Sequence, residues 1–355
     1  MVYRILAINT GSTSTKLALY ENEKPVAVKS YLHENITVHR YQKIFAQLDF
    51  RRETILKFLE EFRVPLETID VFVGRGGLLR PIPSGTYAVN EEMLADLEAE
   101  KYGAHSCNLG AALAYELAKV HGKPAYIVDP VVVDELMPYA RVSGFKGIER
   151  VSIFHALNQK ATGHRYARER GLRYQDLNLI VVHLGGGISC GLHLQGKVVD
   201  VNNALGGEGP FTPERAGTLP AFQLIDICYS GKYTKEELKK QLVGKGGLLS
   251  YIGTSDGVEV ERRIAAGDEE ARFYLEAMGY QIIKEIGALY FAAKGRIDAV
   301  LLTGGLAHSK SLMAFIKENL PAFVNLQIYP GENEMESLVF RVLRVLQGTE
   351  EVKTY

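Results

Sequence analysis

Runs of apolar residues separated by polar turns predict two three-strand meanders in distant parts of the chain. The first spans residues 4–28, with the turn Gly11-Ser12-Thr13 between its first two strands. The second spans residues 179–201, with the turn Gly185-Gly186-Gly187 in the same place. A repeated pattern of this length is typical of a duplicated domain, and a duplication fixes the architecture before any single motif does.

Helical periodicity and short apolar strands fill the rest of each half. Apolar residues at helical spacing predict helices at residues 41–62, 90–120 with an interruption at 101–106, 151–170, 278–293 and 335–346. Short apolar runs predict strands at residues 69–73, 125–128, 299–302 and 325–328. Residues 71–77 and 299–305 each pass from a strand into a glycine turn, which extends the duplication to the later strands. These loops follow the carboxyl ends of strands, where open sheets bind ligands.

Length, composition and charge narrow the class of protein. The length of 355 residues favours two domains, which we place at residues 1–150 and 151–355. The net charge of −1 gives no basis for a nucleic-acid or membrane-surface partner. No apolar run approaches the ~20 residues of a membrane span and no signal-peptide pattern opens the chain, so we expect a cytoplasmic location. Three scattered cysteines, Cys107, Cys190 and Cys228, are expected to be small core residues.

Several catalytic and nucleotide-binding motifs are absent from the sequence. The segment from Gly11 to Lys16 lacks the second glycine of a P-loop. A strand-linked dinucleotide motif, a zinc-protease motif and a nucleophile elbow are also missing. The turn at residues 11–16 still offers backbone N–H groups, hydroxyls and an ammonium group to an anion such as phosphate. An ordinary hairpin with a hydroxyl-rich turn is the alternative.

The strand-end loops carry a mixture of side chains that suits two anions held together. Carboxylates would hold Mg²⁺, arginines would hold oxyanions, and imidazoles would steady the charge on a transferred phosphoryl group. The candidates are Asp129, Glu334, Arg75, Arg215, His105, His155, His183 and the glycines Gly11, Gly185, Gly186, Gly187, Gly304 and Gly305. Each has a structural alternative: Asp129 could form a turn, Glu334 could begin a helix, Arg75 could be solvated, and the histidines could be satisfied polar groups.

In their order along the chain these segments resemble the acetate and propionate kinase family, and most closely its butyrate kinase branch. The resemblance covers nearly the whole chain and rests on residues 8–16 (INTGSTSTK), 154–155 (FH), 183–187 (HLGGG), 215–217 (RAG), 302–305 (LTGG) and 333–334 (NE). Three family elements differ: a His-Arg-x-x-His-Gly-Gly element is replaced by residues 71–77 (VFVGRGG), a second histidine by Gln159, and Gly-Asn-Gly by three glycines. These departures and the shorter chain point to the butyrate branch.

The resemblance implies a role for each matching residue. The catalytic group would be Asn9, Arg75, Asp129, His155 and Arg215, with Arg75 toward the substrate carboxylate. The phosphate and substrate group would be Ser12, Ser14, Lys16 and His105. The nucleotide group would be His183, Gly185, Gly186, Gly187, Gly304 and Gly305, and the magnesium group would be Glu334 and Asp129.

The resemblance also implies a fold and a reaction. The fold would be α/β, with two duplicated ribonuclease H-like domains of the actin-like ATPase kind, each a mixed sheet flanked by helices, around a central active-site cleft. Residues 1–150 would form the acid-substrate side and residues 151–355 the nucleotide-binding side, with the C-terminal helix returning towards the first domain. The reaction would be Mg²⁺-dependent phosphoryl transfer between ATP and butyrate or a related short acid, giving acyl phosphate and ADP, in a homodimer or higher homo-oligomer. The alternatives are an acetate or propionate kinase, a sugar or polyol kinase, and a non-enzymatic actin-like or chaperone-like ATPase module. The acid's length is not readable, because one methylene is worth only ~1–3 kcal/mol in a pocket.

Overall fold

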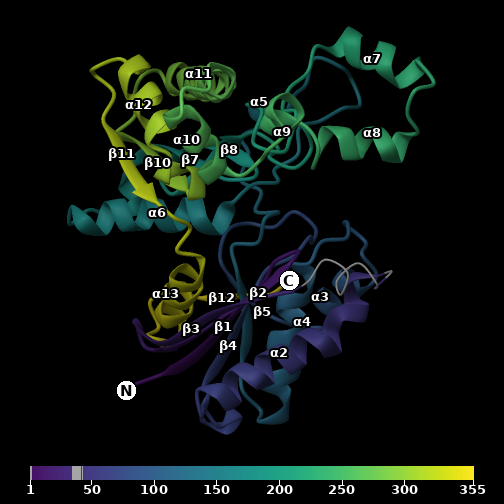
Figure 1. Cartoon of the computed structure of the whole chain (residues 1–355). Coiled ribbons are helices and arrows are strands. Elements are labelled where there is room, and N and C mark those ends of the chain that lie inside the picture. The colour runs from purple at the N-terminus through teal and green to yellow at the C-terminus, as the bar shows by residue number, and fades with distance from the viewer. Residues whose placement is uncertain (1, 34–40, 42) are drawn as a thin grey trace. The chain divides into compact units, whose positions relative to one another are not determined.

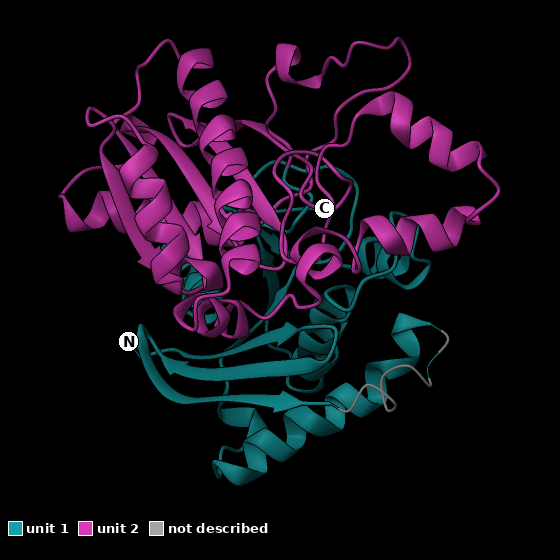
Figure 2. Cartoon of the chain, turned by 45° about the horizontal axis from the view of Figure 1, so that its top comes forward, with its two compact units in different colours: residues 1–133, 333–355 teal, residues 134–332 magenta. Residues whose placement is uncertain are grey.

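The chain folds as two compact units, here called unit 1 and unit 2. The computed structural model describes residues 2–33, 41 and 43–355. Unit 1 comprises residues 1–133 and 333–355, and unit 2 comprises residues 134–332 (Figure 2). These limits differ from the predicted ranges 1–150 and 151–355, because the chain leaves unit 1 after Val133 and returns to it at Asn333.

The sheet of unit 1 has seven strands in the order β12-β5-β6-β4-β1-β2-β3 (Figure 1). Their bounds are β1 Arg4–Thr10, β2 Ser14–Glu21, β3 Lys24–Leu32, β4 Val71–Arg75, β5 Thr86–Ala88, β6 Ala125–Val128 and β12 Val352–Lys353. The first three strands form an antiparallel meander. Strand β4 lies parallel to β1, and β6 lies parallel to β4. The carboxyl ends of β1, β4 and β6 therefore meet at one edge of the sheet.

The sheet of unit 2 has the order β11-β10-β7-β8-β9, which repeats the strands β6-β4-β1-β2-β3 of unit 1. Their bounds are β7 Asn178–Leu184, β8 Ile188–Leu194, β9 Lys197–Val201, β10 Ala299–Gly304 and β11 Leu326–Pro330. The meander is again antiparallel, and β10 and β11 again join it in parallel. Even the register shift recurs, between Leu19 and Tyr20 in β2 and between Leu192 and His193 in β8. The predicted duplication is confirmed at the level of strand order.

Helices cover both sheets. Unit 1 contains α2 Leu48–Glu61, α3 Glu91–Glu98, α4 Asn108–Val120 and α13 Glu334–Leu346, with the 3₁₀ turns η1 Ile44–Gln47 and η2 Leu66–Thr68. Unit 2 contains α5 Pro138–Arg141, α6 Ala156–Glu169, α7 Ala221–Tyr229, α8 Lys235–Leu242, α9 Gly247–Ile252, α10 Gly257–Ala265, α11 Glu269–Ala292 and α12 Lys310–Asn319, with η3 Tyr174–Asp176 and η4 Gly305–His308. Helices α4 and α13 pack on β1, β4 and β6 from the two faces of the sheet (Figure 1).

Each repeat has five strands, and the long helix that follows the fifth strand in the chain packs in the unit that contains the other repeat. Helix α6 follows β6 in the chain but packs on β7 and β10. Helix α13 follows β11 but packs on β1, β4 and β6. Its apolar side, which includes Met335, Leu338, Val339 and Val342, is almost fully buried. Each unit thus depends on a helix that local sequence order would assign to its neighbour.

Most predicted elements are present, and the differences concern the starts of two helices and the exposure of one cysteine. The α/β fold with two mixed sheets is confirmed. The helix predicted at 151–170 begins only at Ala156, so His155 precedes it instead of lying on it. The helix predicted from residue 41 begins as the 3₁₀ turn at Ile44, and position 42 lies outside the described residues. Cys107 and Cys190 are buried as expected, but Cys228 is exposed. Among the described residues, no helix has the length and apolar character needed to cross a membrane.

Candidate functional site

In unit 1, three predicted residues meet beyond the carboxyl ends of two neighbouring strands. Asn9 lies near the end of β1, Arg75 ends β4, and Glu334 begins α13. The Asn9 Nδ2 group donates to Glu334 Oε2. Arg75 Nη2 lies 3.2 Å from Glu334 Oε1, and Arg75 Nη1 lies 3.4 Å from Asn9 Oδ1. Since the Glu334 side chain is 7% exposed and that of Arg75 22% exposed, this is a sheltered ion pair, and the alternative of a solvated Arg75 is wrong.

Asp129 follows β6 at the same edge in a strained backbone conformation. Its φ of 36° is left-handed although Pro130 follows, and a residue before proline normally stays extended. Ser84 Oγ and the Gly85 N–H donate to Oδ1 at 2.6 and 2.8 Å, while Arg341 Nε lies 3.8 Å from Oδ2. Such strain persists only where the surroundings enforce it, and it is concentrated at functional sites.

A buried arginine that the sequence analysis did not single out donates hydrogen bonds to the predicted phosphate turn. Arg51 on α2 is fully buried and donates to the carbonyl oxygens of Gly11, Ser12 and Ser14 at 2.6 to 3.3 Å. Its guanidinium also donates to Thr15 Oγ1 at 2.8 Å. Burial lowers the pKa of Arg51 to about 10. The turn therefore directs three carbonyls at one buried cation, while Ser12 and Lys16 remain exposed.

His105 lies in the loop before α4. The Cys107 N–H donates to His105 Nδ1 at 3.2 Å, so Nδ1 is the acceptor and Nε2 carries the ring proton of the neutral form. Burial raises the pKa of the Cys107 thiol to about 11. The charges of Arg75 and Glu334 also affect the pKa of this thiol, so the loop lies near their ion pair. The thiol itself stays protonated at neutral pH.

In unit 2, two predicted histidines stack on each other. The rings of His155 and His183 are 3.7 Å apart between centroids and only 12° from parallel. His183 Nδ1 lies 2.8 Å from Asn158 Oδ1, and Asn158 Nδ2 donates to the Glu332 carbonyl at 2.6 Å. Because the Asn158 nitrogen faces a carbonyl, its oxygen must face His183, which therefore donates from Nδ1. The Nε2 atom of His183 lies 3.8 Å from Glu332 Oε1.

Arg215 reaches the same place from the long loop after β9. A Cβ on Gly187 would lie 2.3 Å from Arg215 Nη1 and 3.4 Å from His155 Cε1, so the guanidinium, the glycine turn and the imidazole are in close contact. Arg215 Nη1 donates to the Ala204 carbonyl at 2.6 Å. Its buried Nε has no hydrogen-bond partner among the residues that the structure describes. Burial lowers the pKa of Arg215, and nearby Glu214 partly opposes this.

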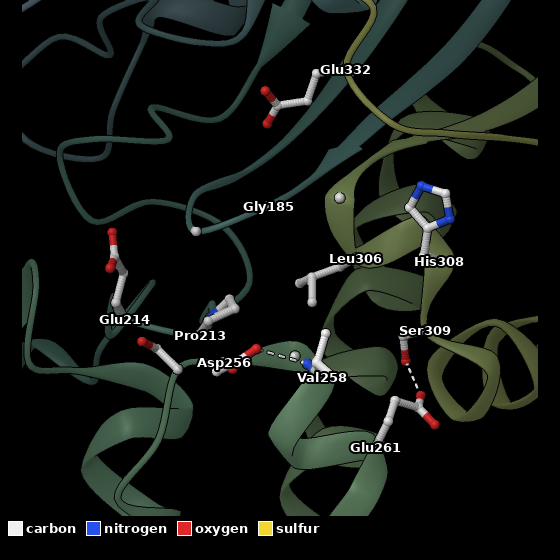
Figure 3. Close-up of a pocket in the computed structure, with 14 residues that line it drawn as sticks. Gly185, Pro213, Glu214, Asp256, Val258, Glu261, Leu306, His308, Ser309 and Glu332 are labelled. Carbon is white, nitrogen blue, oxygen red and sulfur yellow. Dashed lines mark hydrogen bonds between the residues drawn. The ribbon is translucent and has the colours of Figure 1, made fainter. Parts of the chain in front are cut away.

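A cavity of about 430 Å³ opens beside the glycine turn of unit 2 (Figure 3). Gly185, Gly186 and Gly305 line it, together with Leu306 and Val258. Gly304 has a φ of 93°, and a Cβ there would lie 2.3 Å from the Leu184 carbonyl oxygen, so only glycine fits. Glycine backbone and aliphatic side chains in one lining suit a nucleotide, although Glu214, Asp256, Glu261 and Glu332 also line the cavity.

Two carboxylates near the lower part of this cavity have structural duties. Asp256 caps α10 by accepting from the Val258 N–H at 2.9 Å (Figure 3). Glu261 accepts from Ser309 Oγ at 2.5 Å and from the Ser311 N–H at 2.9 Å. The bonds of Glu261 join α10 to the start of α12 and stabilise the cavity wall.

The donor set allows Mg²⁺ without forming a complete protein cage. No group of three or more His, Cys, Asp or Glu side chains in the described part of the chain could hold a metal ion. Mg²⁺ prefers oxygen ligands and is usually held by one or two carboxylates with water and substrate phosphates. Asp129 and Glu334, both almost fully buried and each with a cation beside it, offer such oxygens. The chemistry of these two side chains therefore fits the ion.

The structure groups the predicted residues into two sets, one in each unit. Asn9, Arg75 and Glu334 form one set, and His155, His183, Arg215 and Gly187 form the other. Several supporting residues were missed: Arg51, Ser84, Asn158, Glu332 and Arg341. Only Arg51 left a local signal, since it lies on the apolar side of its helix, four residues before the buried Ile55. The others act through partners distant in the sequence.

The acetokinase family model matches residues 139–335 of this chain. The solved acetate kinase of Porphyromonas gingivalis is 19% identical and superposes with a TM-score of 0.79 over 97% of this chain and 100% of that one. For the acetate kinase of Entamoeba histolytica the values are 15%, 0.75, 96% and 99%. For the propionate kinase of Francisella tularensis subsp. tularensis SCHU S4 they are 20%, 0.71, 96% and 98%. At these identities the structural likeness establishes the fold.

Proposed function

Since the chain belongs to the acetokinase family, and is by that membership an ATP-dependent carboxylate kinase, we propose that its acceptor is butyrate or a related short straight or branched acid. The products would be the acyl phosphate and ADP, in a reversible reaction. The resemblance of residues 71–77 and 183–187 to the butyrate branch supports this choice over acetate and propionate.

The observation that carries the proposal is the environment of Arg215. A half-buried guanidinium whose Nε has no hydrogen-bond partner among the described residues, set against a glycine turn and an imidazole, suits an anionic oxygen as its partner. A phosphoryl group in transfer carries charge on three equatorial oxygens, which arginine and imidazole donors can bind. We assign this role to Arg215 and His155.

The remaining roles follow from the chemistry of a carboxylate acceptor. Such an acceptor is already ionised at neutral pH, so no strong general base is needed, and the main barrier is repulsion between two anions. We assign Arg75 to the acid and Asn9, Ser12, Ser14, Lys16 and His105 to phosphate and substrate binding. Asp129 and Glu334 would hold Mg²⁺, which when bound neutralises phosphate charge. His183, Gly185, Gly186, Gly187, Gly304 and Gly305 would bind the nucleotide, for which the cavity beside Gly185 offers space.

A hydroxamate trap for acyl phosphate tests the reaction and its acceptor together. The purified chain is incubated with ATP, Mg²⁺ and a series of acids from acetate to branched five-carbon acids. We expect the highest kcat/KM with a four- or five-carbon acid. A maximum at acetate or propionate would contradict the assigned acceptor. Phosphorylation of sugars with an empty trap would favour a sugar kinase, and ATP hydrolysis independent of any acid would favour an ATPase module.

Asp129→Asn tests the assigned centre. The amide keeps the size of the side chain but removes the charge that would hold Mg²⁺, so we expect kcat to fall by about 10²-fold or more, beyond the usual effect of changing a residue that only supports a metal ligand. Asp176→Asn is the matched control, because Asp176 lies in an exposed ion pair with Arg173. Near-parental activity of Asp129→Asn, in a protein that still unfolds cooperatively, would contradict the assignment.

We also propose that the chain forms a homodimer in the cytoplasm, where its nucleotide is available. Helix α7 supports a second copy as partner, because none of its nine residues is buried and Phe222 and Tyr229 are 82% and 87% exposed. Asp226 is its one charged residue, so two copies could pair without strong like-charge repulsion. Sedimentation of the parent and of Phe222→Ser tests the homodimer, because a monomeric parent would contradict it. Cell fractionation tests the location.

A further inference from the structure

A chain of buried hydrogen bonds runs from the core of unit 2 to His155. We call it the buried relay, and it consists of Tyr174, His193, Gln159 and Ser189. The Tyr174 hydroxyl lies 2.6 Å from His193 Nδ1, and His193 Nε2 lies 2.9 Å from Gln159 Oε1. Gln159 Nε2 lies 2.7 Å from Ser189 Oγ, which lies 2.8 Å from His155 Nδ1. Gln159, Ser189 and His193 are completely buried.

The orientation of the Gln159 amide fixes the protons at the inner end of the relay. Its nitrogen lies 2.9 Å from the Ser189 carbonyl oxygen as well as close to Ser189 Oγ. A carbonyl only accepts, so the amide nitrogen must face it and Oε1 must face His193. His193 therefore donates from Nε2 and, as a neutral ring, accepts from the Tyr174 hydroxyl at Nδ1. Burial lowers the pKa of His193 well below its usual range, and the charges of Lys160 and His164 add to this.

The Ser189 hydroxyl determines which ring nitrogen of His155 carries the proton. Its oxygen already accepts from Gln159 Nε2, and its own proton needs an acceptor. Among the described residues, His155 Nδ1 is the acceptor within reach of that hydroxyl. If Nδ1 carried a proton instead, the buried hydroxyl proton would be left unpaired, at a typical penalty of about tenfold or more in population. Nδ1 therefore accepts, and the proton of neutral His155 lies on Nε2.

We propose that the buried relay positions His155 by holding it in the Nε2–H tautomer. Nε2 is then a permanent hydrogen-bond donor that needs no proton from solvent before it can meet an anionic oxygen. That this oxygen belongs to a phosphoryl group rests on the proposed function, whereas the tautomer itself does not. The relay residues are positioning residues, because they act on the reaction only through His155.

The packing of β8 shows that room is reserved for the relay. A Cβ on Gly191 would lie 2.2 Å from Gln159 Oε1 and 3.1 Å from His193 Nε2. Any side chain at this position would push apart the two atoms that form the bond. A glycine in the middle of a buried strand weakens that strand, and here it makes space for the hydrogen bond between Gln159 and His193.

Nitrogen-15 NMR of the histidine rings in the full chain tests the proposal directly. Long-range proton–nitrogen spectra distinguish the two neutral tautomers, and the signal of His155 is identified by its loss in His155→Gln. We expect His155 protonated at Nε2 in the parent, and a mixture of tautomers in Ser189→Ala. Ser250→Ala, which removes the hydroxyl of an exposed serine elsewhere in unit 2, should leave His155 unchanged. A parent protonated at Nδ1, or an unchanged tautomer in Ser189→Ala, would overturn the proposal.

Kinetics supply a second reading that a purely structural role would not produce. In Ser189→Ala we expect kcat to fall about tenfold, the scale of one hydrogen bond, with KM for ATP and for the acid within about twofold. A rise of KM of about tenfold with an unchanged kcat would contradict a positioning role. The expected tautomer in a protein that phosphorylates no acid would support the relay and contradict the proposed function, so the two can fail separately.

Discussion

At the scale of single residues, Arg51 shows how much the turn at residues 11–14 depends on one fully buried side chain. Its guanidinium has no carboxylate hydrogen-bond partner in the described structure, and its charge is balanced by backbone carbonyls and by Gln47 and Thr15. The Ser14 carbonyl also accepts from the Gly11 N–H at 2.9 Å, within the turn itself. Arg51 therefore adds donors to those that the turn supplies to itself.

Replacing the fully buried Arg51 with methionine should destabilise the protein, although methionine is the more apolar side chain. The change keeps most of the side-chain volume but removes the Arg51 donor from the buried Thr15 and Gln47 side chains, at about 1–3 kcal/mol for an unsatisfied buried group. The free energy of unfolding in urea measures this. Arg52→Met is the control on the same helix, since Arg52 forms exposed ion pairs and should change stability by about 0.5 kcal/mol or less. Equal effects of the two changes would contradict the assigned role.

His33 makes the same turn sensitive to acid. Thr15 Oγ1 accepts from Arg51 and lies 2.8 Å from His33 Nε2, so a proton on Nε2 would take away the acceptor of the Thr15 hydroxyl proton and set a second positive charge near Arg51. Burial, with the Arg51 charge, lowers the pKa of His33 to about 4. The unfolded chain binds this proton near pH 6.5 and the folded chain only near pH 4, so stability is lost as pH falls from about 6.5 to 4.

Unfolding in urea at pH 7 and pH 5 tests this dependence. His33→Gln keeps an acceptor for Thr15 but cannot be protonated, so its loss of stability between the two pH values should be smaller than that of the parent. His121→Gln replaces an exposed histidine and should lose as much as the parent. If His33→Gln also loses as much as the parent, His33 is not the source of the acid sensitivity.

At the scale of secondary structure, sequence reasoning succeeded where the signal is local. Both meanders were predicted because alternation and glycine turns lie within one short window, and the helices followed from their apolar stripes. Strands β5 and β12 were missed because three and two residues cannot display a period. The candidate residues were found through strand-end position and resemblance, but their supports, such as Ser84 for Asp129, depend on long-range folding. Local patterns thus predicted the elements, and tertiary contacts determined the supports.

The last residues of the chain anchor the edge of the unit 1 sheet. Strand β12 pairs with β5, and Tyr355 is 6% exposed behind it. The Tyr355 hydroxyl donates to Asp96 Oδ2 at 2.8 Å, and the Arg80 guanidinium stacks on its ring at 3.9 Å. This buried aromatic contact explains why a two-residue strand can persist at a chain end.

Tyr355→Ala should therefore cost about 3–5 kcal/mol in the free energy of unfolding, as for other buried aromatic side chains. Thermal or urea unfolding measures the change. Tyr139→Ala is the control, because Tyr139 is 87% exposed and its removal should be nearly neutral. A small effect of Tyr355→Ala would mean that the C-terminal residues are not part of the folded sheet.

At the scale of the whole molecule, the chain divides at Val133 and Asn333 and not at the middle of the sequence. Sequence order suggested two consecutive domains, because each meander begins a new repeat. The helix that closes each repeat nevertheless packs in the other unit, so unit 1 consists of two separate segments, and unit 2, although continuous, begins before its own repeat with α6. No local pattern predicts this exchange, because an amphipathic helix shows which side it buries but not against which sheet.

This exchange predicts that residues 1–133 cannot fold alone. Met335, Leu338, Val339 and Val342 of α13 are almost fully buried in unit 1, and each such side chain contributes about 1.5–3 kcal/mol. Together they approach the whole stability of a domain, about 5–15 kcal/mol. Residues 1–133 joined to residues 333–355 by a flexible linker should unfold cooperatively in urea, whereas residues 1–133 alone should not. A second joined chain with Leu338→Asp should lose the transition, because a carboxylate cannot replace that buried side chain. Cooperative unfolding of residues 1–133 alone would mean that α13 is an addition to a complete core and not a part of it.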